Sequence, residues 1–137
     1  MRFAALLAVV LLSLTLFAPP APAAARDAFV GAWAVTVTPD DTTGKAGEKE
    51  FKDTFTFKGM QFTSEACNKK HGFKSAEYTE DTRGGIAATF KCEAKSDKQG
   101  TATWTGTSTG SSIKGELVWK KPDGTELRYS FTGEKKS

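Results

Sequence analysis

The sequence predicts an all-β domain, and within that class an eight-stranded antiparallel up-and-down barrel. From Phe29 onward, apolar residues recur at every second position, which is the period of a strand and not of a helix. Most connections are short and contain Gly, Asp, Asn, Ser or Pro, as in consecutive hairpins. A sheet with one apolar face and no covering helices must fold over as a sandwich or close as a barrel. Adjacent hairpins favour the barrel, because its last strand can pair with its first; a β-sandwich is the alternative.

The individual strands follow from side-chain parity. In the first, Phe29, Trp33, Val35 and Val37 share one parity and threonines occupy the other. The same alternation recurs along the chain, clearly in most stretches and more weakly at 73–79. The expected strands cover residues 29–37, 54–58, 60–63, 73–79, 86–93, 101–107, 113–120 and 126–132.

The connections carry residues that set turn dihedrals. In the strongest, at 121–124, Pro122 presets φ, Asp123 accepts from the backbone and Gly124 takes a positive φ. Further turns are expected at 68–72, 81–85, 96–100 and 109–112. The connection at 39–50 is polar and too long for a tight hairpin, so we interpret it as a candidate lid.

The first 25 residues predict a secretory signal peptide. Arg2 supplies a positive start, residues 3–17 are almost wholly apolar, a proline cluster follows, and Ala23 to Ala25 form an A-x-A cleavage site. An uncleaved anchor would need about 20 apolar residues, and the prolines interrupt the run too early. We therefore expect one domain at 26–137, secreted or periplasmic, without a membrane span.

Composition and charge argue against several classes of function. Without Arg2 the domain has 18 basic and 16 acidic residues, a net charge of +2 with both signs interleaved, which does not favour nucleic acid as a partner. His71 is the single histidine and lies in a polar segment, where a solvated turn residue is the simpler interpretation. Cys67 and His71 lack the further ligands of a metal site. We expect a non-enzymatic protein with no catalytic residues, no metal and no cofactor.

Cys67 and Cys92 form the only cysteine pair. In an oxidising compartment such a pair predicts a disulfide. Cys92 shares the inward parity of Phe90, but Cys67 has the opposite parity to Phe62, so the bridge requires a bulge or a strand end near 64–67. Free thiols are the alternative.

Gly31-Ala32-Trp33, inside the first expected strand, resembles the G-x-W signature of lipocalins and, more broadly, of calycin barrels. The resemblance implies that Trp33 plugs the closed end of the barrel and that the 39–50 connection covers the open end. It also implies a carrier of small molecules. The family's T-D-Y-like stretch and C-terminal helix are not found, so the resemblance supports the fold more than the activity.

The inward-facing aromatic residues could line a pocket for a small apolar or amphipathic molecule. Asp53 is the one charged residue with inward parity in its strand, and a buried carboxylate needs a partner such as a ligand head group or Tyr129. The alternative is a barrel filled by its own rings, which serves as an interaction module for protein or polysaccharide, for example as an inhibitor. The candidate ligand-binding residues are Trp33, Asp53, Phe55, Phe57, Phe90, Trp104, Trp119 and Tyr129.

Overall fold

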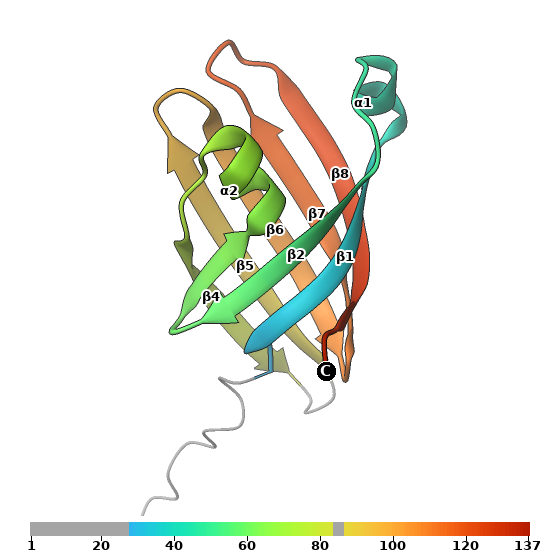
Figure 1. Cartoon of the computed structure of the whole chain (residues 1–137), viewed down its shortest axis with the longest axis vertical. Helices are drawn as coiled ribbons and strands as arrows, with labels where there is room; N and C mark the ends of the chain where they lie inside the picture. The colour runs from blue at the N-terminus through green and yellow to red at the C-terminus, as the bar shows by residue number, and fades with distance from the viewer. Residues whose placement is uncertain (1–27, 84–86) are drawn as a thin grey trace, which may run out of the picture.

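A computed structural model describes residues 28–83 and 87–137, which form a closed eight-stranded barrel (Figure 1). Every strand pairs antiparallel with its neighbours in the chain, and β1 also pairs with β8, so the up-and-down barrel is confirmed and the sandwich is excluded. The strands are β1 (Gly31–Pro39), β2 (Phe51–Lys58), β3 (Gln61–Ser64), β4 (Ala76–Arg83), β5 (Ala87–Ser96), β6 (Gly100–Thr109), β7 (Ser112–Lys120) and β8 (Glu126–Lys135). The predicted signal peptide at 1–25 and part of the predicted turn at 81–85 lie outside the described residues.

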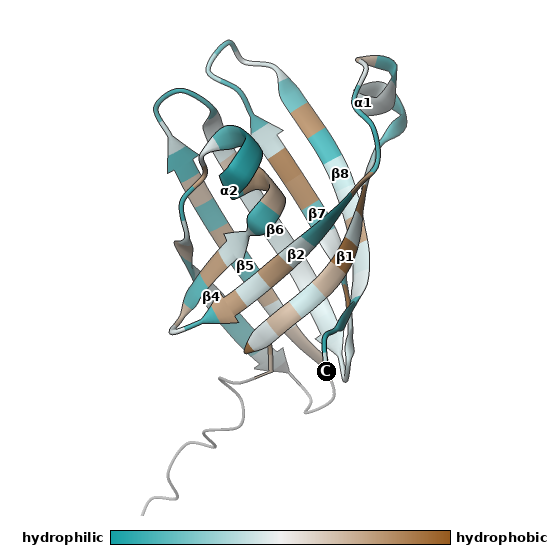
Figure 2. Ribbon diagram, viewed as in Figure 1, coloured by the Kyte–Doolittle hydropathy of each residue, from teal (hydrophilic) through white to brown (hydrophobic). Residues whose placement is uncertain are grey.

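The alternating pattern matches the observed burial. Along β5, and along β8 as far as Phe131, every second side chain is buried. Figure 2 shows the same alternation in bands of hydropathy along the strands. The fourth strand differs from the prediction, since it begins at Ala76 rather than residue 73 and continues to Arg83. No helix in the described parts of the chain is long and apolar enough to cross a membrane.

Two short helices were not predicted. Helix α2 (Glu65–His71) replaces most of the turn expected at 68–72. The Ser64 side chain accepts a hydrogen bond from the Cys67 amide, and Gly72 ends the helix in the left-handed conformation. Glu65 lies in the first turn and basic residues lie in the last, as the helix dipole favours.

Helix α1 (Asp41–Lys45) lies within the predicted long connection. Its N-terminus is capped by Asp40, whose carboxylate accepts from the Thr43 amide at 2.7 Å. The Thr43 hydroxyl in turn accepts from the Arg128 amide in β8 at 2.9 Å. Figure 1 shows α1 and α2 at the same end of the barrel, which we call the mouth.

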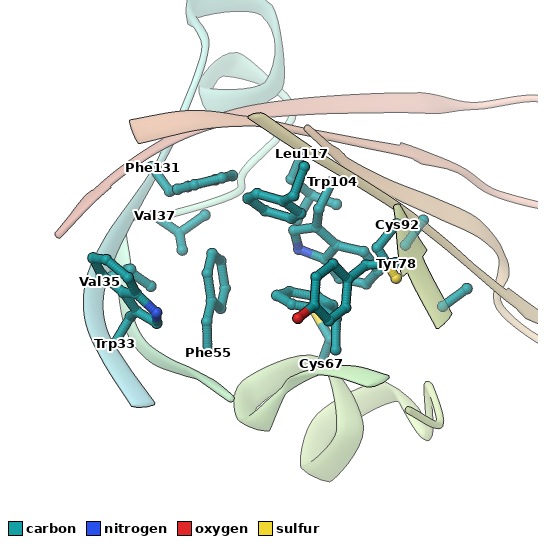
Figure 3. Close-up of a cluster of buried hydrophobic side chains, with 14 of the residues drawn as sticks. Trp33, Val35, Val37, Phe55, Cys67, Tyr78, Cys92, Trp104, Leu117 and Phe131 are labelled. Carbon is teal, nitrogen blue, oxygen red and sulfur yellow. The ribbon is translucent and has the colours of Figure 1, made fainter. Parts of the chain in front are cut away.

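The barrel interior is filled by aromatic rings (Figure 3). The centroid of the Phe57 ring lies 5.0 to 5.2 Å from the centroids of four others, those of Phe29, Phe62, Tyr78 and Phe90. Edge-to-face and tilted pairs at these separations are favourable, and such close rings leave little space between them. The aromatic side chains less than 2% exposed are Trp33, Trp104, Tyr78, Phe29, Phe55, Phe57, Phe62 and Phe131.

The expected disulfide is absent from the structure, where Cys67 and Cys92 are both free and buried. Cys67 lies on α2, so strand parity does not describe its direction. Cys92 lies on β5 and its sulfur is 3.6 Å from the Ala76 carbonyl oxygen. The alternative of two free, buried thiols is the one observed.

Candidate ligand pocket at the barrel mouth

A pocket of about 350 Å³ opens at the mouth, and we call it the mouth pocket. Four parts of the chain enclose it: the segment after α1, the start of β2, helix α2, and the adjacent strands β7 and β8. Its lining residues are Gly47, Glu48, Lys49, Glu50, Phe51, Ala66, Cys67, Lys70, His71, Leu117, Trp119 and Tyr129.

The apolar part of the lining is held in place by specific contacts. The Trp119 indole N–H donates to the Gln99 carbonyl oxygen at 2.6 Å, which orients the ring. The Phe51 and Tyr129 rings pack edge to face with centroids 5.9 Å apart. Leu117 completes this surface. These four side chains, Phe51, Leu117, Trp119 and Tyr129, are the apolar floor of the pocket.

Tyr129 ties the segment after α1 to the barrel. Its hydroxyl donates to the Glu48 carboxylate at 3.2 Å. Burial, with the nearby Glu48 charge, raises the pKa of Tyr129 well above its usual range. The phenol is therefore a neutral hydrogen-bond donor at physiological pH, and its bond to Glu48 helps to define one wall of the pocket.

His71 lies at the C-terminal end of α2, half-buried against Trp119, with ring centroids 4.5 Å apart. The interpretation of His71 as a solvated turn residue was therefore wrong. Burial lowers the pKa of His71, Lys70 and Lys121 lower it further, and Glu48 opposes them. The imidazole is thus predominantly neutral at pH 7.

Asp53 does not reach the mouth pocket but connects β2 to the start of α2. Its carboxylate accepts from the Ser64 hydroxyl, from the Ala66 amide at 2.8 Å and from the Thr54 amide at 2.7 Å. Desolvation raises the pKa of Asp53, and these three hydrogen bonds act against that rise. Tyr129 is not its partner, since that hydroxyl donates to Glu48. Asp53 therefore positions the helix that forms one wall of the pocket.

The predicted site residues are consequently divided. Trp119 and Tyr129 line the mouth pocket. The others, apart from Asp53, are packed in the core: Trp33, Phe55, Phe57, Phe90 and Trp104. Within this group, the Trp33 indole donates to the Phe29 carbonyl oxygen at 2.8 Å. The Trp104 indole N–H has no hydrogen-bond partner in the described part of the chain.

Comparison with protein-family models, with curated proteins and with solved structures gave no match. The closed up-and-down barrel is compatible with the calycin resemblance. The function of the pocket is therefore inferred from its own residues and contacts.

Sequence reasoning missed the half of the pocket that comes from outside the barrel strands. Ala66, Lys70 and His71 reach it through α2, and Glu48 reaches it through the segment after α1. One signal for α2 was available: Ser64 followed by Glu65, with basic residues and then Gly72 after them, has the pattern of a capped helix. The hydrophobic period did not reveal a helix of only seven residues.

Proposed function

We propose that this chain binds a small amphipathic molecule in the mouth pocket and does not transform it. The observation that carries the proposal is the apolar floor, which persists at the mouth although rings fill the barrel below it. A volume of about 350 Å³ falls within the range of small-molecule sites, about 300 to 1,000 Å³. The sequence predicted a ligand between the aromatic interior and the 39–50 connection, and the proposed site lies on the side of that connection, against residues 47–50.

The chemistry of the lining favours binding over catalysis. Burial raises the pKa of the Cys67 thiol to about 11, so this group is not an activated nucleophile. The Tyr129 phenol is held protonated, and the His71 ring packs on Trp119. Together with the leader-like residues 1–25, these features support a secreted or periplasmic binding protein with a lipocalin-like role.

Trp119 provides the direct test. Titration with the anionic fluorophore anilinonaphthalene sulfonate should quench tryptophan emission to saturation and increase the fluorescence of the probe. The variant Ala66→Phe adds a ring to the pocket wall and should weaken binding, whereas Thr42→Phe, at an exposed position on α1, should not. Calorimetry on the same variants gives a readout that is independent of fluorescence. Equal binding by wild type and Ala66→Phe would refute a site in the mouth pocket.

The filled interior favours a second candidate, a rigid module that presents its loops and outer faces to protein or polysaccharide. Affinity capture from the native extracellular fraction distinguishes the two. A stoichiometric macromolecular partner retained equally by wild type and Ala66→Phe, with no saturable probe binding, would favour the module.

A further inference from the structure

We propose that the mouth pocket selects anionic amphipathic molecules, with an acidic head group on Lys70 and Lys121 and an apolar part on Phe51 and Trp119. This inference rests on the proposed function and adds the chemical class of the ligand. It depends on which charged side chains around the pocket already have a hydrogen-bond or ion-pair partner, and on where the side chains without one lie.

The carboxylates of the lining already accept hydrogen bonds. Glu48 accepts from the Tyr129 hydroxyl at 3.2 Å, and Glu50 accepts from the Thr38 hydroxyl at 3.0 Å. Neither interaction involves a cation. A cationic ligand would therefore compete with contacts that hold the pocket wall in place.

The ammonium groups of Lys70 and Lys121, in contrast to these carboxylates, have no polar partner in the part of the chain that the structure describes. Within 28–83 and 87–137, the side-chain ammonium groups of Lys70 and Lys121 form no ion pair and no hydrogen bond. Each instead lies over a ring of the apolar floor. The Lys70 nitrogen is 5.5 Å from the Phe51 centroid, and the Lys121 nitrogen is 5.1 Å from the Trp119 centroid. Donors with no carboxylate partner beside an apolar surface suit a ligand with a negative head and an apolar body.

Lys49 adds a further positive charge at the pocket. Lys49 and Lys70 line the pocket, and Lys121 lies beside it over the Trp119 ring. Lys49 makes no ion pair in the described chain either, so three lysines without carboxylate partners surround a pocket whose two glutamates are engaged. Lys70 and Lys121 both lower the pKa of His71, which places all three groups in one local field. A bound anion would be attracted by this positive charge.

The packed interior limits the apolar part of the ligand. Leu117 and Trp119 line the pocket, and their neighbours across the β6–β7 ladder are Trp104 and Ala102, which are buried. Phe73 packs against both Trp104 and Trp119, with ring centroids 6.4 and 5.8 Å away, so the floor is backed by further rings. The ligand body must lie across the floor and cannot extend down into the barrel, which favours medium-length chains or planar bodies over long chains.

Three ligands of equal chain length test the head group: decanoate, decanol and decyltrimethylammonium, each below its micelle concentration. By calorimetry, decanoate should bind roughly tenfold more tightly than decanol, and the cation most weakly. The preference should shrink at high salt, because the lysines are partly exposed.

Neighbouring lysines provide a matched control. The double variant Lys70→Gln/Lys121→Gln should lose roughly five- to tenfold in decanoate affinity and keep its affinity for decanol. The double variant Lys74→Gln/Lys120→Gln changes net charge equally at exposed positions outside the pocket and should bind like wild type. Circular dichroism of each variant checks the fold.

The outcomes separate the two proposals. Equal affinity for the three ligands, all lost in Ala66→Phe, would overturn the anionic preference and leave the pocket. Equal loss in both double variants would also overturn it, because a general charge effect would then explain the data. No saturable binding of any ligand or of the fluorophore would overturn the proposed function itself.

Discussion

The imidazole of His71 packs against the indole of Trp119 with ring centroids 4.5 Å apart, and this contact joins α2 to β7 across the mouth pocket. The two residues are far apart in the chain, and neither strand parity nor turn composition connects them. The contact places a titratable imidazole in the lining of the mouth pocket. Lys70, Lys121 and Glu48 are the charged neighbours of this histidine.

The first prediction concerns pH. Because burial lowers the pKa of His71 below its ordinary value of 6.5, protonation favours the unfolded chain. The histidine's contribution to the free energy of unfolding is therefore complete above pH 6.5 and is lost as the pH falls through and below that value. Urea denaturation between pH 7.5 and 5 should show a steeper decline for wild type than for His71→Gln. Parallel profiles would contradict this assignment.

The second prediction concerns Asp53. Replacement by alanine removes the acceptor of the Ser64 hydroxyl and of the Ala66 and Thr54 amides. We expect a loss of about 2 to 3 kcal/mol in the free energy of unfolding, because these donors lie in or near the core. Asp53→Asn, which keeps one acceptor oxygen, should lose less. Urea denaturation measures both variants, and hydrogen exchange should show faster exchange in α2. A loss below about 0.5 kcal/mol would show that Asp53 does not anchor the helix.

The third prediction compares two glycines. A Cβ atom at Gly115 would lie 2.0 Å from the Thr105 carbonyl oxygen and 2.6 Å from the Gly106 Cα, so the backbones of β6 and β7 would have to separate. Gly115→Ala should destabilise the barrel by about 2 to 3 kcal/mol. At Gly44, in α1, no atom lies within 4 Å of the new carbon, and alanine should be neutral or stabilising by up to about 1 kcal/mol. Thermal unfolding should separate the two variants by roughly 10 °C or more. Similar melting temperatures would contradict the close strand contact.

The fourth prediction concerns the thiols. Burial raises the pKa of Cys67 to about 11 and that of Cys92 to about 12, so both should react slowly with a thiol reagent in the native protein. In urea, without reductant, mass spectrometry should detect two alkylation adducts. A mass with no adducts under those conditions would establish the disulfide that the structure lacks.

The local alternation of apolar and polar residues was sufficient to predict the barrel but not to locate the ligand pocket. The two-residue period is visible in each strand, as in Trp33, Val35 and Val37. Closure was the favoured of two ways to bury the apolar face, because in a series of adjacent hairpins the last strand can pair with the first. The parity of Trp119 and Tyr129 correctly placed both on the inner face. These features depend on neighbours in sequence, so the sequence alone determined them.

Tertiary structure decided where a ligand could fit. Whether inward rings line a cavity or fill it depends on how Phe57, Phe62 and Phe90 meet across the barrel, which no single strand specifies. Helix α2 forms through the Ser64 cap and the Gly72 terminus, and Asp53 holds it from another strand. The mouth pocket exists because segments far apart in the chain converge at one end of the barrel, and that convergence is a property of the closed fold.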